Sequence, residues 1–494
     1  MKNKRLLVLF LALLTASVSI IGCSQSTTEN DTAAESTETV SVETDPEKPI
    51  PDLPDRDFEG YEFTILSRGK SNIYLISQDI DAEALNGEAI NDAVFTRNTA
   101  IEERFNITIC EEGGATASPD GQVHDSVVAG EDLYDLLILG GKTCGNLAAL
   151  QYLLDLKNIP YMDLTNPWYD QSANASLSIG NKLFMTSGDF TIKDNDATWG
   201  VLFSKTLASN LIKENLYSLV SDGDWTLDKM KEYCSIAYVD LNGDGTHDPD
   251  DQWALVGEAW NTMAFVEGSG SKIVEKDEND LPYISAGGET FYDSFLKAMA
   301  LNADESHTMI ADRFLSNFGD VWSECINKAF LEDRALFYCG GMNRVTMLRD
   351  METDFGILPI PKSNAEQENY TCLVSDYMAT MLSVPIVAGD TERTGIIIEA
   401  LSAESVNTLT PAYYEITLKR KSSRDEESAA MLDLIFASRS FDLGNMYGWG
   451  GLFDTITQMA STGDTNLAST IASKLTATEE AMQKTIDAIM DNGQ

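Results

Sequence analysis

The twelve residues from Asp240 to Asp251 have the spacing of a calcium-binding loop. The residues at positions 1, 3, 5, 6, 9 and 12 of this run are, in order, Asp240, Asn242, Asp244, Gly245, Asp248 and Asp251. Position 7, which contributes its backbone carbonyl, is Thr246. Calcium prefers about six to eight oxygen ligands, which an EF-hand loop supplies from these positions around the turn that its glycine permits. We therefore expect a structural calcium ion here. The alternative is an Asn-Gly-Asp-Gly surface turn that binds no metal.

Catalytic motifs are missing from the sequence. The chain contains no Cys-x-x-Cys, His-Glu-x-x-His or Gly-x-Ser-x-Gly spacing, and it has three histidines. The run 140–143 (GGKT) looks like the end of a phosphate-binding loop, but Leu136 stands where that motif needs glycine. We therefore expect no enzyme. A glycoside hydrolase or lyase stays open as an alternative, because the distance between paired carboxylates is not visible among 79 acidic residues.

Several tryptophans stand next to glycine or polar residues, as in loops that display aromatic rings: Trp168, Trp199, Trp260 and Trp449. Sugars are recognised by flat apolar faces beside amides and carboxylates in a crevice that excludes water. Asn195, Asp196 and Trp199 supply that mixture within five residues. For any single tryptophan, packing in the core is the competing interpretation.

Charge and composition exclude some partners. The 494 residues carry 79 acidic and 34 basic side chains, a formal net charge of −45. Such a chain repels phosphate backbones, so we expect no nucleic-acid partner. A hydrophobic content of 43% indicates packed cores, and the length indicates more than one lobe.

The N-terminus has the plan of an export signal. Basic residues at positions 2, 4 and 5 precede the apolar run 6–14, and the segment ends at Gly22 and Cys23. It resembles a bacterial lipoprotein signal, so we expect a signal peptide over residues 1–22 and a lipid, such as palmitate, on Cys23. Residues 23–54 are rich in Ser, Thr and Glu and predict a disordered tether. The expected location is the extracytoplasmic face of the cell membrane.

The globular part alternates between strand and helix patterns. Residues 61–67 alternate apolar and polar side chains, and residues 134–139 (YDLLIL) form the run of a strand buried on both faces. Similar runs recur at residues 197–203, 335–339 and 355–360, and the last hundred residues are helical in pattern. This predicts an α/β fold with parallel pairing and more strands than one sheet holds.

The order of these segments resembles the extracellular solute-binding proteins of bacterial ABC importers, the sugar-binding class that includes maltose-binding protein. The resemblance covers nearly the whole chain. It is carried by NDAVFTRNTAIEERFNI, NKLFMTSGDF, WGVLFSKTL, WTLDKMKEY, ALFYCGG, FGILPIPK and TPAYYEITLKRKSSRDEESAAMLDLIF.

The resemblance implies a two-lobe, type II periplasmic-binding-protein-like fold with hinge crossovers and a ligand cleft between the lobes. The crossovers would lie near residues 190–200 and 358–372. Lobe 1 would comprise residues 55–194 and 366–404, and lobe 2 residues 195–365 and 405–494, with the calcium-type loop in lobe 2.

By position, the same resemblance places ligand contacts at the ends of strands, at the crossover and in the closing helices. Together with Trp260 from the aromatic loops, these are Ser67, Arg68, Gly141, Lys142, Asp196, Trp199, Gly341, Asn343 and Trp449. The implied function is capture of an oligosaccharide by hinge closure and its delivery to an ABC permease, by a monomer. The alternative is a glycan-binding or sensor lipoprotein that is not coupled to transport.

Overall fold

The computed structural model describes residues 50–69, 75–114, 116, 119–348, 351–418 and 426–491. Residues 48–494 form one compact unit. The signal peptide, Cys23 and nearly all of the expected tether lie outside the described residues. Within the described ranges, no helix is long and apolar enough to cross a lipid bilayer.

The first sheet has the strand order β12-β3-β1-β2. Its strands are β1 (Tyr61–Ser67), β2 (Ile107–Gly113), β3 (Leu136–Gly140) and β12 (Thr380–Ser383). β1 runs parallel to β2 and β3, whereas β12 runs antiparallel to β3. The expected strand over residues 61–67 is confirmed, and every residue of β3 is buried, as its apolar run predicts.

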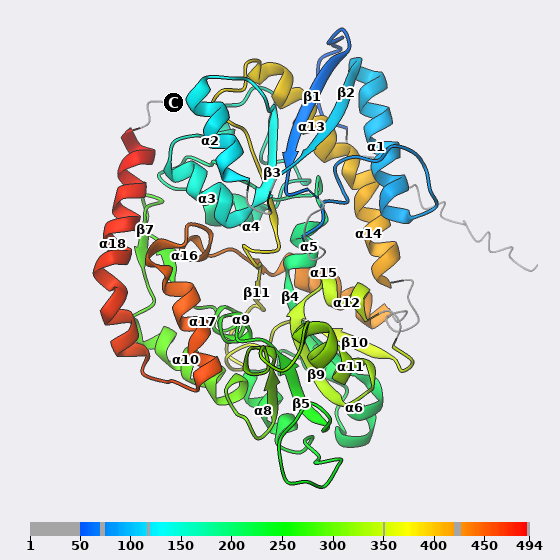
Figure 1. Cartoon of the computed structure of the whole chain (residues 1–494), viewed down its shortest axis with the longest axis vertical. Helices are drawn as coiled ribbons and strands as arrows, with labels where there is room; N and C mark the ends of the chain where they lie inside the picture. Colours follow the sequence, from blue (N-terminus) through cyan, green and yellow to red (C-terminus); the bar gives the residue numbers. More distant parts are fainter. Residues whose placement is uncertain are drawn as a thin grey trace, which may run out of the picture. The chain divides into compact units, whose positions relative to one another are not determined.

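Among the described residues, five helices pack around this sheet. They are α1 (Ala89–Phe105), α2 (Asp120–Ala129), α3 (Gly141–Ala149), α13 (Thr391–Asn407) and α14 (Leu409–Leu418). α1, α13 and α14 pack against one another, as Figure 1 shows at the right. A small apolar cluster between α1 and α14 contains Ile90, Val94, Leu409 and Tyr413.

The second sheet has the order β10-β4-β9-β5-β8. Its strands are β4 (Trp199–Ser204), β5 (Trp253–Gly257), β8 (Thr308–Ile310), β9 (Ala335–Gly341) and β10 (Phe355–Leu358). β5 is parallel to β8 and β9, but β4 is antiparallel to both β9 and β10. Both sheets are therefore mixed, which corrects the expectation of parallel pairing alone. Antiparallel strands enter because the chain crosses from one sheet to the other.

The helices around the second sheet are α6 (Lys205–Leu211), α7 (Leu216–Ser221), α8 (Leu227–Cys234), α9 (Asn261–Gly268), α10 (Glu289–Asn302), α11 (Lys328–Leu331), α12 (Asn343–Met347) and α15 (Glu426–Ala437). Trp225 is fully buried in this core, and its Nε1 donates a hydrogen bond to the carbonyl of Pro359 at 2.9 Å.

The remaining short elements are η1 (Leu156–Asn158), α4 (Gln171–Leu177), β6 (Val274–Lys276), β7 (Pro282–Ile284), η2 (Ala311–Arg313) and η3 (Trp322–Asn327).

The two sheets are joined by short segments that lie side by side. The chain leaves the first sheet through α5 (Lys193–Ala197) into β4, and it returns between β10 and β12 through β11 (Cys372–Leu373). The two crossings are hydrogen-bonded, since the Ser375 N–H donates to the carbonyl of Ala197 at 3.0 Å. β11 also pairs in parallel with β13 (Arg439–Ser440).

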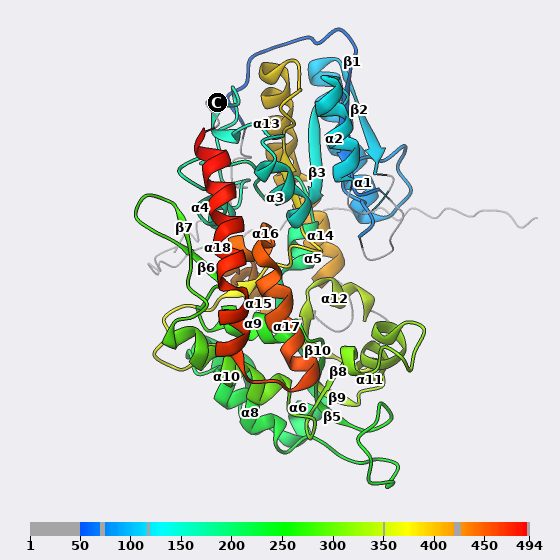
Figure 2. The same cartoon turned by 60° about the vertical axis from the view of Figure 1, so that its left-hand side comes forward.

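The C-terminal helices contact elements of both sheets. They are α16 (Leu443–Met446), η4 (Trp449–Gly451), α17 (Leu452–Thr462) and α18 (Leu467–Asp491). α17 packs on α9, whereas α16 and α18 contact α3, and Figure 2 shows α16 to α18 coming forward together. The expected lobe boundaries stay a prediction; α14, expected in lobe 2, packs on α1.

The cysteines that the structure describes are all free thiols. Five are buried and Cys110 is half-buried: the buried ones are Cys144, Cys234, Cys325, Cys339 and Cys372. They act as small apolar side chains in the cores.

Candidate ligand site at the junction of the two sheets

The carboxyl ends of strands from both sheets lead to the junction. Arg68 follows β1 and Gly141 follows β3, while Trp260 and Asn343 follow β5 and β9. Loops at the carboxyl ends of strands form the ligand crevice of open α/β sheets. The topology therefore brings side chains from distant parts of the sequence to one place.

Arg68 contributes a buried cation beside an exposed aromatic ring. Its Nη1 donates to the carbonyl of Tyr377 at 2.6 Å, and its guanidinium carbon lies 5.7 Å from the centre of the Tyr377 ring. A Cβ at Gly140 would lie 3.4 Å from this guanidinium, which is an ordinary van der Waals contact. Burial lowers the pKa of Arg68, and the side chain of Tyr377 is 55% exposed.

The first turn of α3 connects the first sheet to the second crossing and to α17. The N–H of Gly141 donates to the carbonyl of Asp376 at 3.1 Å. Lys142 Nζ forms an ion pair with Asp454 on α17 at 3.0 Å. Two predicted ligand contacts are thus held beside Asp376.

On the second sheet, two predicted tryptophans form a stacked pair. The rings of Trp199 and Trp260 have centroids 6.3 Å apart and an interplanar angle of 20°, and Phe453 packs on Trp260 at 4.9 Å. Trp199 is buried at 3% exposure, whereas Trp260 is half-buried. Of the two indoles, that of Trp260 is therefore the more exposed.

Three further predicted residues gather around the register pair of β4 and β9. Trp199 lies opposite Gly341 in the pairing of the two strands. A Cβ on Gly341 would lie 2.8 Å from the carbonyl of Asp196 and 3.1 Å from Asn343 Oδ1. That position therefore requires glycine. The Asp196 carboxylate pairs with Lys193 at 3.1 Å and accepts a hydrogen bond from the Tyr413 hydroxyl at 3.2 Å.

Within the part of the chain that the structure describes, the buried polar atoms without a hydrogen-bond partner include Trp199 Nε1, Asn343 Oδ1 and Asp376 Oδ1 at this junction, as well as both carboxylate oxygens of Glu267 and Trp168 Nε1. Each such atom costs about 1–3 kcal/mol when it is left unpaired, so such atoms are rare without a reason. The three atoms at the junction thus leave one donor and two acceptors for another molecule. Sequence reasoning found Trp199 and Asn343 but missed Asp376, although it directly follows the second crossing.

A cavity of about 820 Å³ lies between segments that flank the two sheets, and Trp199, Asn343 and Asp376 are not among its lining residues. Its walls come from the segment before α1, from α5, from α12 and from α14. Asp196 is the predicted contact that lines it. Its other polar walls, which the sequence analysis missed, include Gln78, Asp81, Asn86, Glu88, Asn91 and Thr346.

The structure places Ser67 and Trp449 differently from the other predicted contacts. Ser67 is fully buried, and its hydroxyl donates to Glu111 at 2.5 Å and accepts from the Gly69 N–H at 2.9 Å. Trp449 is 4% exposed, stacks on Tyr447 at 4.9 Å and donates its Nε1 hydrogen to Thr485 at 3.0 Å. Both side chains have their polar atoms satisfied, and their role as ligand contacts stays a prediction.

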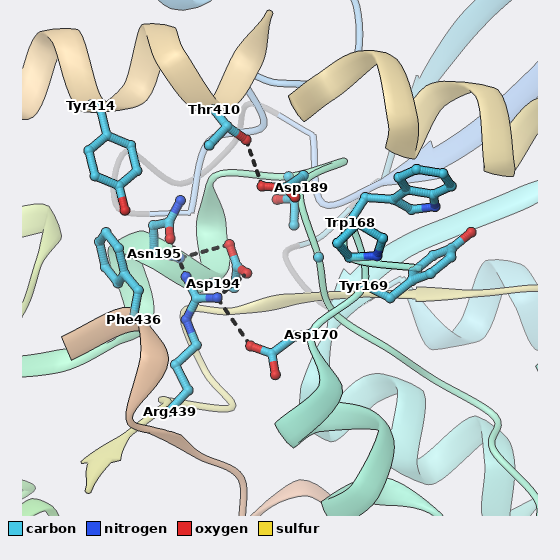
Figure 3. A pocket seen from close by; sticks show the side chains of 13 residues that line it. Trp168, Tyr169, Asp170, Asp189, Asp194, Asn195, Thr410, Tyr414, Phe436 and Arg439 are labelled. Atoms are coloured by element: carbon cyan, nitrogen blue, oxygen red, sulfur yellow. Dashed lines mark hydrogen bonds and ion pairs between the residues drawn. The ribbon is translucent and has the colours of Figure 1, made fainter. Parts of the chain in front are cut away.

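A second cavity of about 210 Å³ lies at the hinge, where Figure 3 shows Arg439 among acidic side chains. Arg439 Nη1 lies 3.1 Å from Asp170 and 3.2 Å from Asp194, and its other nitrogens donate to Asn195 and Thr198. Burial raises the pKa of Asp194 to about 6. This arginine therefore ties the segment before α4 to the first crossing.

The loop 240–251 is folded around its own polar side chains. Asp240 accepts hydrogen bonds from the N–H groups of Gly243 and Gly245, and Asp251 accepts from Leu241 N–H and the Tyr238 hydroxyl. Within the part of the chain that the structure describes, no three His, Cys, Asp or Glu side chains are grouped to hold a metal ion. The calcium ion stays a prediction.

Sequence comparisons give no relative: no family model and no curated protein matches the chain. Solved structures do match. They include a cyclo/maltodextrin-binding protein complexed with maltotetraose (TM-score 0.54, 11% identity, 88% of this chain and 98% of that chain) and the sugar-binding protein MalE from Xanthomonas citri (0.56, 13%, 87% and 97%). UgpB from Mycobacterium tuberculosis in complex with glycerophosphocholine matches similarly (0.57, 12%, 86% and 99%). The chain therefore has the mixed α/β, two-lobe type II fold of the sugar-binding proteins of ABC transporters.

Proposed function

We propose that the protein is a substrate-binding lipoprotein that captures a carbohydrate between its two lobes for an ABC importer. The observation that carries this proposal is the group of unpaired buried atoms on Trp199, Asn343 and Asp376 at the junction of the sheets. A sugar hydroxyl both donates and accepts hydrogen bonds, so a polyol offers partners of the kind that each of these atoms lacks.

The aromatic side chains beside these atoms fit the same ligand class. Trp260 offers a half-exposed indole, and Tyr377 offers a ring that is exposed to solvent and held by Arg68. Apolar ring faces pack on the C–H face of a sugar, while the polar atoms select its hydroxyls. Solved structures of similar fold hold maltotetraose and acarbose, which supports a carbohydrate over an amino acid.

Capture would work by hinge closure. Arg68 and Gly141 follow strands of the first sheet, and Trp260 and Asn343 follow strands of the second, so a ligand would gain all its contacts when the two lobes meet. Contacts that exist in one conformation alone shift the population toward it. The ion pair of Lys142 and Asp454 supports this mechanism, because α17 packs on α9 of the second sheet.

The proposal also includes a lipid anchor and a permease partner. Cys23 would carry the lipid and hold the binding unit at the extracytoplasmic face, and the closed form would be read by the permease. No catalytic step on the ligand is part of this function.

A calcium ion in the loop 240–251 would be structural. The loop precedes β5 at its amino end, whereas Trp260 follows the carboxyl end of the same strand. An ion there would stabilise the second lobe without touching the ligand.

Titration calorimetry and small-angle scattering test the proposal. We expect one or more of maltotriose, maltotetraose, cellotriose and xylotriose to bind and to reduce the radius of gyration. Glycerophosphocholine serves as the non-carbohydrate comparison. Binding of that solute alone, or an unchanged radius with every sugar, would contradict carbohydrate capture by closure.

A further inference from the structure

Asp376 is a buried carboxylate at the centre of the junction. It is 3% exposed, and its Oδ1 has no hydrogen-bond partner among the residues that the structure describes. Its backbone carbonyl receives the N–H of Gly141, and the neighbouring Ser375 N–H is bonded to Ala197 in the first crossing. The residue therefore sits where α3, both crossings and the end of the first sheet meet.

The segment that contains Asp376 is linked by backbone hydrogen bonds to the segments that contain Trp199 and Asn343. The Thr198 carbonyl accepts from Met342 N–H at 2.9 Å, and Thr198 forms a bridge with Val374, two residues before Asp376. A Cβ at Gly341 would lie 3.6 Å from the Met378 side chain. Backbone hydrogen bonds thus fix Trp199, Asn343 and Asp376 relative to one another.

Charged and polar groups face Asp376 from each element around it. Lys142 comes from α3, Asp454 from α17, Asn445 from α16, Arg68 from the end of β1, and Glu267 from α9. Lys142 is already paired with Asp454, and Arg68 donates to Tyr377. Among the described residues, none of these groups donates a hydrogen bond to Asp376 Oδ1.

We propose that Asp376 is a ligand-contacting residue that accepts a hydroxyl hydrogen of a neutral, polyhydroxylated solute and releases its own proton to solvent on binding. This inference rests on the proposed function and adds to it a residue and a proton linkage. An ionised carboxylate accepts a stronger hydrogen bond than a neutral acid, so a ligand hydroxyl favours the ionised form. In the ligand-free protein, burial raises the pKa of Asp376 to about 7.

The affinity for the ligand should depend on pH in one direction. Below pH 7 the ligand must displace a proton from Asp376, whereas above pH 7 the carboxylate is already ionised. Affinity for a neutral sugar therefore rises as pH rises through 7 and then levels off. The ligand itself does not titrate in this range, so the dependence belongs to the protein.

The variant Asp376→Asn keeps an acceptor oxygen and loses the charge. We expect affinity for the best sugar of the panel to fall about tenfold at pH 8, the difference between a charged and a neutral hydrogen bond. At pH 6 the two proteins should bind nearly equally. Calorimetry in buffers of different ionisation enthalpy should show proton release with the wild type and none with Asp376→Asn.

Two variants serve as controls. Asp135→Asn changes another buried aspartate, which lies before the amino end of β3, and should keep the wild-type affinity and pH profile. Glu267→Gln changes a neighbouring carboxyl on α9 whose pKa is also raised by burial, and the proton release should persist in this variant if it comes from Asp376.

Equal affinity and pH profile for wild type and Asp376→Asn would overturn the inference and leave carbohydrate capture standing. If no sugar of the panel binds to the wild type, the proposed function and the inference both fail. A melting temperature of Asp376→Asn at or above that of the wild type at pH 8 shows that lost affinity is not lost folding.

Discussion

At the scale of single residues, the junction differs from the cores in how its polar atoms are satisfied. Trp225 is as buried as Trp199, but its Nε1 has a carbonyl partner and that of Trp199 has none. Trp449 also differs from Trp199 in this respect, because its Nε1 donates a hydrogen bond to Thr485. Among the described residues, Trp199 thus keeps an unpaired indole N–H at the junction, as Trp168 does beside the cavity of Arg439, whereas the indole N–H groups of Trp225 and Trp449 are paired.

Removal of an aromatic platform should weaken binding. Trp260→Ala deletes the half-buried ring that stacks on Trp199, and we expect affinity for the bound sugar to fall about tenfold or more. Trp322→Ala, which removes another half-buried tryptophan on η3, is the control. Equal affinity losses in the two variants would argue against a specific role of Trp260. Calorimetry measures both.

The stability of the ligand-free protein should depend on Asp376. Burial raises its pKa from the ordinary 3.8 to about 7, so between these values the folded protein holds a proton that the unfolded chain has lost. The free energy of unfolding therefore falls as pH rises from 4 to 7, by about 1 kcal/mol per pH unit from this group. Asp376→Asn should lack this contribution. Urea unfolding at several pH values, compared with the wild type, checks it.

At the scale of elements, the hinge is held by one arginine. Arg439 on β13 contacts Asp170 before α4 and Asp194 in α5, and the side chains of all three are about nine-tenths buried or more. Three segments far apart in the sequence are thereby fixed at the place about which closure would occur.

Loss of this arginine should destabilise the fold. Arg439→Met leaves Asp170 and Asp194 buried without their cation, and we expect a loss of about 3–5 kcal/mol in the free energy of unfolding. The triple variant Asp170→Asn, Asp194→Asn, Arg439→Met removes all three charges and should recover much of that loss. Urea denaturation compares them, and an Arg439→Met protein as stable as the wild type would show that the cluster is not structural.

The loop 240–251 should act on stability alone. We expect calcium to raise the melting temperature of the wild type and of Asp250→Ala, which changes a position that supplies no ligand, but not that of Asp244→Ala. Sugar affinity should be the same with and without calcium, because the loop and Trp260 lie at opposite ends of β5. A calcium-dependent affinity would contradict a purely structural ion.

At the scale of the whole molecule, the proposed anchor and the binding unit are separate. In a bacterial host that processes lipoproteins, we expect Cys23→Ser to move the protein from the membrane fraction to the soluble fraction without altering sugar affinity. Ser24→Ala is the matched control. Fractionation followed by immunoblotting reads the outcome, and membrane retention of Cys23→Ser would exclude lipidation at this cysteine as the anchor.

The sequence by itself determined the elements and their order. The alternation at residues 61–67 and the apolar run that ends in β3 reflect local burial, which side-chain type encodes directly. The positions of Arg68, Gly141 and Asn343 at strand ends followed from the same pattern. The mixture of parallel and antiparallel strands did not, because pairing direction depends on where the chain crosses between sheets.

Only the tertiary structure decided which side chains meet. Arg439 and Asp170 are 269 residues apart, and Asp376 joins Trp199 through backbone bonds between the two crossings. Whether a polar atom is paired depends on neighbours from distant segments, so residue type alone could not separate Trp199 from Trp449. For the same reason Asp376 was not recognisable in the sequence among 79 acidic residues.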